Sequence, residues 1–288
     1  MAGNRKAGVP HRFTALARGA LLAGNSWNGM VLSIHERAIY ILRDDNLAVS
    51  IVANEESMTA MSVLVPLLFS APPGENIVAR VSSCTRDRLL IKDFAAIDLA
   101  ACPTWSGRLP SFAPHSITID TLQRVTKALE QFGSSRGLFG VLKQTQAAEG
   151  ESPHVTAARQ ALQAGSFWKL VGLGPGLTPA GDDFLVGAQL AAAIFRPDRQ
   201  SSFTLDSEQI RARFAGTTPA GRTLLWTVIQ GHFPAPFVNF ANALTQAKDI
   251  DLDAAVRGVC EYGESSGTDV LTGFCWMASR FIIPTRNG

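Results

Sequence analysis

The sequence predicts an α+β protein, in which an antiparallel β-rich domain (a sheet or small barrel) precedes a mainly α-helical domain. Three observations support this prediction. Runs of β-branched and aliphatic residues alternate with short polar turns over residues 13–118. Apolar residues recur at helical spacing over residues 119–283, and a glycine-containing helix start occurs there three times. We therefore expect two domains, 13–118 and 119–283.

The first part is predicted to hold short strands after an unstructured tail of about twelve residues. The expected strands cover 30–34, 38–42, 47–52, 77–81 and 89–91, with turns at 44–46 and 72–74. Short strands at this spacing favour an antiparallel sheet or small barrel. Residues 105–114 form a proline-rich link to the second part.

The second part is predicted to be helical. The expected helices cover 122–132, 155–164, 182–195, 207–214, 224–230, 237–247, 252–262 and 269–282, and 140–146 is expected to continue as helix. Gly133 and Gly165 directly follow the first two of these helices, where glycine commonly ends a helix.

The most informative stretch is VGLGPGLTPAGDDFLVGAQL, which covers Val171–Leu190. A glycine-rich loop leads into an apolar helix, for which Thr178 is the predicted N-cap and Pro179 the first residue. Gly181 falls in the first turn, where glycine costs about 1 kcal/mol relative to alanine. The missing side chain therefore indicates close approach to the backbone, either by a ligand or by another helix.

The same unit recurs twice. TPAGRTLL, which starts at Thr218, repeats TPAGDDFL, and SSGTDVLTG, which starts at Ser265, repeats AGDDFLVG from its glycine onward. The unit is a hydroxyl residue, then Gly-x-(Asp or Thr)-x-Leu, then an apolar helix. Its glycines lie 40 and 46 residues apart, a spacing that suits repeated helix pairs.

Composition narrows the class of protein. The chain is 46% hydrophobic and 17% charged, which is typical of a globular protein. A net charge of +2 gives no reason to expect a nucleic-acid or membrane partner. The N-terminus lacks the apolar core of a signal peptide, and no apolar run has the roughly 20 residues of a membrane span. The four cysteines form no C-x-x-C pair, so we expect reduced thiols and a cytoplasmic location.

The repeat suggests an anion site. If the three helices start at one place, their N-termini supply partial positive charge and unpaired N–H groups, and Thr178, Thr218 and Ser265 add hydroxyls. A small planar acid or a phosphate would suit such a site. Arg222 would either neutralise an aspartate or bind the anion. The alternative is that Gly181, Gly221 and Gly267 only let helices pack closely.

The aspartates allow a second hypothesis. Asp182, Asp183 and Asp269 sit at predicted helix starts, where carboxylates complement the helix dipole or hold Mg²⁺. His35, His115 and His232 have no pairing in the linear sequence that makes a catalytic triad. The glycine loop is neither a P-loop nor a dinucleotide fingerprint, because it lacks the Gly-Lys-Ser/Thr end and the surrounding βαβ unit.

GLGPGLTPAGDDFLVG, TTPAGRTLLWTVIQGHF and GESSGTDVLTG resemble a bacterial family long labelled a domain of unknown function. That family includes the small subunit of the oxamate carbamoyltransferase complex of allantoin breakdown, part of purine catabolism. The resemblance covers most of residues 120–283. Pro219 and Ala220 depart from it, since an aliphatic residue and a serine are expected there.

The resemblance implies a transferase subunit that works with two other proteins, one of them similar to acyl-CoA synthetases. The reaction would pass a carbamoyl group between oxalurate and phosphate, giving oxamate and carbamoyl phosphate, with no cofactor and no metal. Asp182, Asp183 and Asp269 would be catalytic. The anion would be bound by Gly174, Gly176, Thr178, Gly181, Thr217, Thr218, Gly221, Arg222, Ser265, Ser266 and Gly267. Two alternatives stay open: a stand-alone Mg²⁺-dependent hydrolase using the aspartates, and a non-catalytic scaffold subunit.

Overall fold

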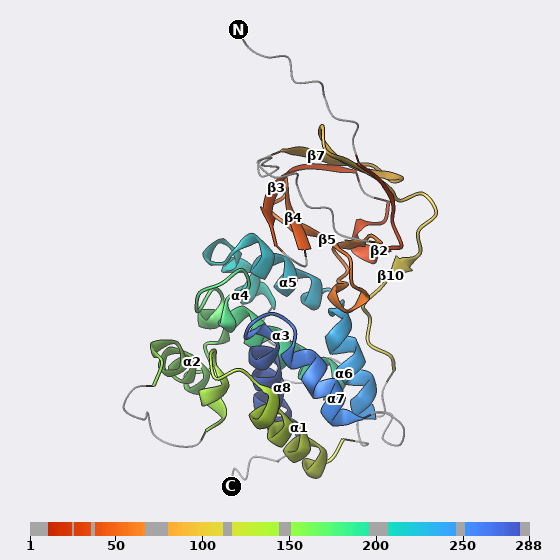
Figure 1. The fold of residues 1–288 in the computed structure, drawn as a ribbon. Coiled ribbons are helices and arrows are strands. Elements are labelled where there is room, and N and C mark those ends of the chain that lie inside the picture. The colour runs from red at the N-terminus through yellow and green to blue at the C-terminus, as the bar shows by residue number, and fades with distance from the viewer. Residues whose placement is uncertain are drawn as a thin grey trace. The chain divides into compact units, whose positions relative to one another are not determined.

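The structure is a computed structural model, and it describes residues 11–24, 26–35, 38–66, 80–111, 117–143, 151–195, 207–245 and 251–282. The chain divides into two compact units, residues 1–107 and 108–288. The first unit is built from strands and the second from helices (Figure 1). The α+β fold class is confirmed, whereas the domain limits 13–118 and 119–283 stay a prediction.

The described strands of the first unit form one curled, mixed sheet (Figure 1). They are β1 (His11–Thr14), β2 (Ala17–Gly19), β3 (Trp27–Ile34), β4 (Ala38–Arg43), β5 (Ala48–Val52), β6 (Ser62–Leu64), β7 (Val81–Cys84), β8 (Arg88–Ile91), β9 (Ala95–Asp98) and β10 (Thr104–Trp105). Their order across the sheet is β1-β9-β8-β7-β3-β4-β5-β6-β2-β10. Two 3-10 turns, η1 (Ala20–Leu22) and η2 (Glu55–Ser57), lie between strands.

Along a strand, residues either alternate between buried and exposed or are all buried, depending on where the strand lies in the sheet. In β8, Leu89 and Ile91 are buried while Arg88 and Leu90 are exposed, the period of two expected when one face covers a core. Every residue of β5 is buried, so this strand is covered on both faces.

Two features of the sheet correct the sequence prediction. Three pairs, β1–β9, β5–β6 and β2–β10, are parallel, so the sheet is mixed and not antiparallel throughout. The tail ends before His11, because His11 and Arg12 already pair with β9. Such long-range pairings leave no trace in the local pattern of apolar residues and turns.

The second unit contains the helices, and every predicted helix has a counterpart among them. They are α1 (Ile119–Phe132), α2 (Pro153–Gln163), α3 (Ala180–Phe195), α4 (Ser207–Ala212), α5 (Pro219–Ile229), α6 (Ala235–Thr245), α7 (Leu252–Cys260) and α8 (Ser266–Ile282), with 3-10 turns η4 (Phe139–Leu142), η5 (Phe167–Leu170) and η6 (Phe214–Gly216). The predicted helix at 140–146 is the shorter turn η4 as far as it is described. The turn at 72–74 and most of the strand at 77–81 lie outside the described residues.

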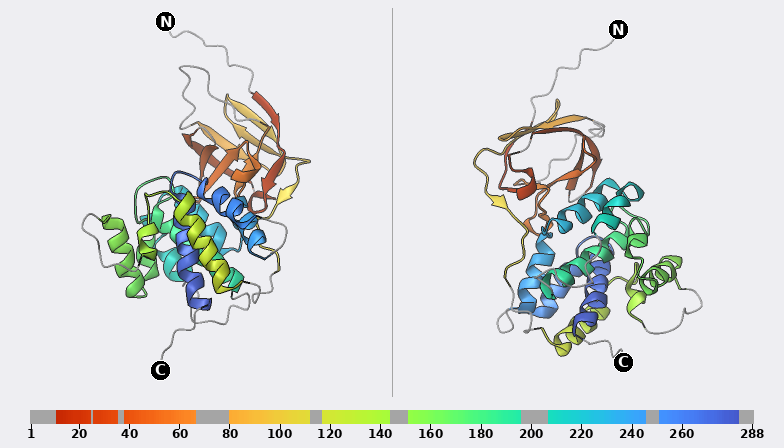
Figure 2. Two further views of the ribbon diagram at one scale, coloured as in Figure 1. Left: turned by 60° about the horizontal axis from the view of Figure 1, so that its bottom comes forward. Right: turned by 180° about the vertical axis from the view of Figure 1, so that it is seen from behind.

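Helix α8 packs along α3 and also contacts α1 and α7 (Figure 2). Two glycines let α3 and α8 approach closely. A Cβ atom on Gly187 would overlap the carbonyl oxygen of Val270, and one on Gly273 would overlap that of Phe184. These glycines are therefore required by helix packing. None of the described helices is long and apolar enough to cross a bilayer.

Candidate functional site

The loop before α3 is shaped by three glycines. Gly172, Gly174 and Gly176 have φ angles of +75°, +99° and +114°, a region that other residues rarely adopt. The backbone N–H groups of Gly174, Gly176 and Leu177 donate to no acceptor within the described residues. The loop therefore has three backbone N–H groups beside the start of α3, at half-buried or exposed positions, that are available to bind a ligand.

Asp182 is fully buried in the first turn of α3 and bonded on both carboxylate oxygens. The N–H of Gly172 donates to its Oδ1 at 2.8 Å, and the hydroxyl of Thr217 donates to its Oδ2. Burial raises the pKa of Asp182 from 3.8 to about 6, although both hydrogen bonds act against that rise. Asp182 thus joins the glycine loop to the segment before α5.

Asp183 is also fully buried, but only one of its oxygens is bonded. The hydroxyl of Thr178 donates to Oδ2 at 3.1 Å and lies 3.0 Å from the hydroxyl of Ser266. Oδ1 has no hydrogen-bond partner within the described residues. Burial raises the pKa of Asp183 well above 3.8; the Ser266 and Thr178 hydroxyls oppose that rise, while the charges of Asp269 and Asp182 add to it.

The predicted N-cap of α3 is wrong. Thr178 donates its hydroxyl to Asp183 instead of accepting from a first-turn N–H, and α3 begins at Ala180. The N–H of Gly181 donates to the carbonyl oxygen of Leu173 at 2.8 Å, because the glycine loop folds back over the helix start. The equivalent cap in the second sequence repeat, at the start of α5, does form: Thr218 accepts from the N–H of Gly221 at 3.0 Å.

Asp269, in the first turn of α8, repeats the arrangement of Asp183. The N–H of Leu138 donates to its Oδ1 at 2.5 Å, and its Oδ2 has no hydrogen-bond partner among the described residues. Burial raises the pKa of Asp269 from 3.8 to about 7, and the Leu138 bond lowers it in part. Gly137 has φ +93°, and a Cβ atom there would overlap the carboxylate. The sequence indicates a loop at residues 134–137 but not its contact with Asp269, for which Gly137 was the one signal.

The starts of α3, α5 and α8 lie together, as the hypothesis required. Thr178 and Ser266 join α3 to α8. Thr217, two residues before α5, donates to Asp182 of α3, and Thr218 donates to the carbonyl oxygen of Leu177. The three repeats therefore form one hydrogen-bonded cluster of helix starts.

The repeat glycines face protein atoms. A Cβ atom on Gly181 would overlap the carbonyl oxygen of Leu170, and one on Gly267 would overlap that of Val259. A Cβ atom on Gly221 would overlap the Asp182 carboxylate. These glycines permit close packing inside the cluster, which is the alternative role that the sequence left open.

The remaining predicted residues have structural partners. Arg222 donates from Nε to the carbonyl oxygen of Phe214 at 3.1 Å, and the pKa shifts of Asp182 and Asp183 have no contribution from it. The carbonyl oxygen of Ser265 accepts from the N–H of Asp269 at 2.9 Å. Across the part of the chain that the structure describes, no three His, Cys, Asp or Glu side chains are grouped as metal ligands, so the three aspartates make no Mg²⁺ site by themselves.

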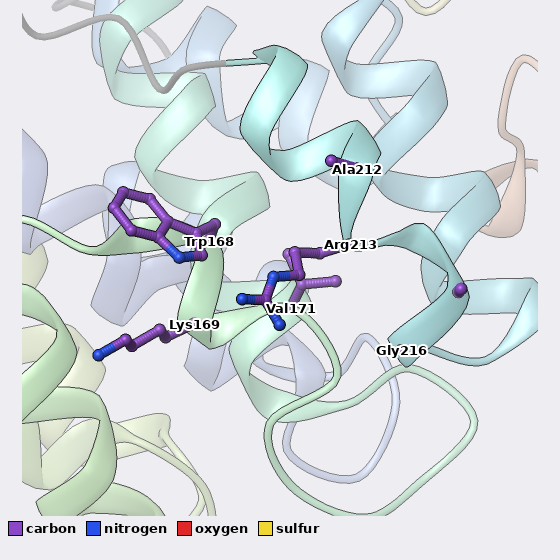
Figure 3. Close-up of a pocket in the computed structure, with 7 residues that line it drawn as sticks. Trp168, Lys169, Val171, Ala212, Arg213 and Gly216 are labelled. Carbon is purple, nitrogen blue, oxygen red and sulfur yellow. The ribbon is translucent and has the colours of Figure 1, made fainter.

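A pocket of about 390 Å³ lies beside this cluster (Figure 3). It is lined by Trp168, Lys169, Val171, Ala212, Arg213, Ala215 and Gly216. These residues come from η5 and the residue after it, and from the end of α4 and the segment that joins α4 to α5. No motif or spacing in the sequence distinguishes these residues as a site.

The segment that holds the three helix starts matches a known family. The family model described as oxamate carbamoyltransferase subunit AllH matches residues 170–278. This segment belongs to that family. No solved structure matches the chain. The AllH match begins at the end of η5 and ends within α8, so it contains the glycine loop and Asp182, Asp183 and Asp269.

Proposed function

We propose that the chain is a subunit of an oxamate carbamoyltransferase-type enzyme and that the clustered starts of α3, α5 and α8 help to bind its small anionic substrates. One observation carries the proposal: the segment that matches the AllH family is the segment in which three repeated helix starts are joined by hydrogen bonds through Thr178, Thr217 and Ser266.

The available groups suit substrates that carry both an acidic group and an amide. The unused N–H groups of Gly174, Gly176 and Leu177, with the positive end of α3, favour carboxylate or phosphate oxygens. The unbonded oxygens of Asp183 and Asp269 favour amide N–H donors or water. Oxamate and carbamoyl phosphate each combine an anion with an amide.

The reaction would join the carbamoyl carbon of oxalurate to a phosphate oxygen and break its bond to the ureide nitrogen. The proton that phosphate gives up ends on the nitrogen of the departing oxamate. Backbone donors would stabilise the negative charge that develops on the carbamoyl oxygen. Burial raises the pKa of both Asp183 and Asp269, for Asp269 to about 7, and a carboxyl group with a raised pKa could pass a proton to that nitrogen.

The same proposal includes two protein partners, one similar to acyl-CoA synthetases, and a place in allantoin breakdown. All four cysteines are free, which supports a reducing compartment such as the cytoplasm. A non-catalytic scaffold role is the second candidate. It is favoured by the repeat glycines, because Gly181, Gly221 and Gly267 face protein atoms and not an open site.

The test is reconstitution with the two candidate partner subunits. We expect all three to co-purify and to form carbamoyl phosphate from oxalurate and phosphate. Asp183→Asn keeps the shape of the buried side chain and should lower the rate about a hundredfold, the lower end of general acid–base effects. Asp120→Asn, at an exposed position in the first turn of α1, is the control.

Thermal unfolding first has to show that the variants are folded, so that a change in activity can be assigned to the substituted side chain. Full activity of an assembled Asp183→Asn complex would remove the catalytic role and leave the scaffold. Failure of the wild-type chain to assemble with either partner, or to support carbamoyl transfer, would overturn the proposed function itself.

A further inference from the structure

The residues that line the pocket beside the helix starts have no role in the proposed function. Two of its lining side chains, Lys169 and Arg213, are cationic and exposed, and its other lining residues are Trp168 and small or apolar residues (Figure 3). Its volume of about 390 Å³ falls at the small end of the range of about 300–1,000 Å³ found for small-molecule sites.

The two cations are available for a ligand. Within the described residues, neither the ammonium of Lys169 nor the guanidinium of Arg213 makes an ion pair or a side-chain hydrogen bond. None of the described residues that line the pocket is acidic. Two cations without a protein counterion in one concave site attract an oxyanion, and a guanidinium can bind its oxygens in a bidentate manner.

Trp168 supplies a flat apolar surface beside these charges. Its neighbour Phe167 packs edge-on against Trp276 of α8, with ring centroids 5.6 Å apart, which fixes η5 on the helical core. Trp168 itself stays half-buried at the pocket. A planar ligand group can therefore stack on a ring whose backbone is already held in place.

The walls of the pocket are connected through the backbone to the hydrogen bonds of Asp182. Val171 and Gly216 of its lining directly precede Gly172 and Thr217, the two residues that donate to the Asp182 carboxylate. A ligand that shifts either wall of the pocket would thus act on a hydrogen bond to Asp182.

We propose that this pocket binds a small organic oxyanion with a flat body, that Arg213 and Lys169 bind its carboxylate or phosphate, and that Trp168 stacks on its body. The inference rests on the pocket alone and holds whether or not the chain takes part in carbamoyl transfer.

Calorimetric titration of the full chain tests the charge requirement. Benzoate and phenyl phosphate should bind, and the ratio of their affinities shows whether a carboxylate or a phosphate is preferred. Benzamide, the neutral counterpart of benzoate, should bind at least about tenfold more weakly, because hydrogen bonds to charged groups are the stronger ones. Equal affinity for benzamide, or no binding of either anion at millimolar concentration, would overturn the proposal.

Variants locate the site. Arg213→Gln and Lys169→Gln remove exposed charges and should each weaken benzoate binding about five- to tenfold. Arg211→Gln, an exposed position in the last turn of α4 that does not line the pocket, should leave the affinity unchanged. An equal loss in all three variants would show a general effect of charge and would refute the assignment.

The flat surface has its own test. Benzoate should bind more tightly than acetate, and Trp168→Leu should remove that advantage while Trp168→Phe keeps most of it. If the ratio of benzoate to acetate affinity is the same in Trp168→Leu as in the wild type, Trp168 does not contact the ligand.

Discussion

Replacing Asp269 by asparagine should change how the stability of the helical unit depends on pH. The carboxyl group is fully buried, and its pKa rises from 3.8 to about 7 on folding. The folded state therefore holds a proton that the unfolded state has lost between these two values. The sign follows directly: the free energy of unfolding is highest below pH 3.8 and falls as the pH rises toward 7.

The size of the effect comes from the same two values. One pKa unit corresponds to about 1.4 kcal/mol, so deprotonating Asp269 costs the folded state about 4 kcal/mol in full, of which about 3 kcal/mol falls between roughly pH 5 and pH 8. That is a large part of a typical stability of about 5–15 kcal/mol. Asparagine cannot ionise, so the variant should lose this part of the pH dependence.

Urea unfolding of the wild type and of Asp269→Asn at acidic and mildly alkaline pH gives the measurement. The difference in unfolding free energy between the two conditions should shrink by about 3 kcal/mol in the variant. The exposed Asp120→Asn variant should leave it unchanged. If Asp269→Asn keeps the full pH dependence, the carboxyl group is not held in its buried, protonated form and the reasoning fails.

Two further changes test the packing and the hydrogen bonds of the cluster. Gly187→Ala should destabilise the protein by about 1–3 kcal/mol, because its Cβ atom would overlap the Val270 carbonyl oxygen, whereas Gly258→Ala, exposed on α7 with open space around it, should stabilise by up to about 1 kcal/mol; thermal unfolding that shifts both variants in the same direction would contradict this. Thr217→Val should cost about 1–3 kcal/mol and raise the pKa of Asp182 further, since it removes a donor from a buried carboxylate. Thr217→Ser keeps the donor and should remain close to the wild type in urea unfolding, and a loss as large as that of valine would show that the methyl group matters instead.

The sequence predicted those features that depend on neighbouring residues. Helical periodicity placed the helices within a few residues of their observed bounds, and the repeated Thr-Pro-Ala-Gly signalled that α3 and α5 start in related ways. The Thr218 cap formed as expected. The Thr178 cap did not, because the preceding loop folds back and supplies the Leu173 carbonyl oxygen instead.

The rest depends on contacts between distant parts of the chain. Leu138 donates to Asp269 across 131 residues, and a backbone donor carries no sequence signal of its own. The pocket could not be predicted for the same reason, since Lys169 and Arg213 look like ordinary surface cations in the sequence and only the fold brings them to one place. The parallel pairing of β1 with β9 likewise joins segments more than eighty residues apart.

The close contact between α3 and α8 has a consequence for biosynthesis. Helix α8 is the last described helix, and it provides much of the apolar surface that covers α3. A nascent chain that has left the ribosome only as far as α7 therefore exposes α3, which is apolar on nearly every side. This half should therefore complete its folding only after α8 has been synthesised, and until then the exposed α3 is where a chaperone would bind.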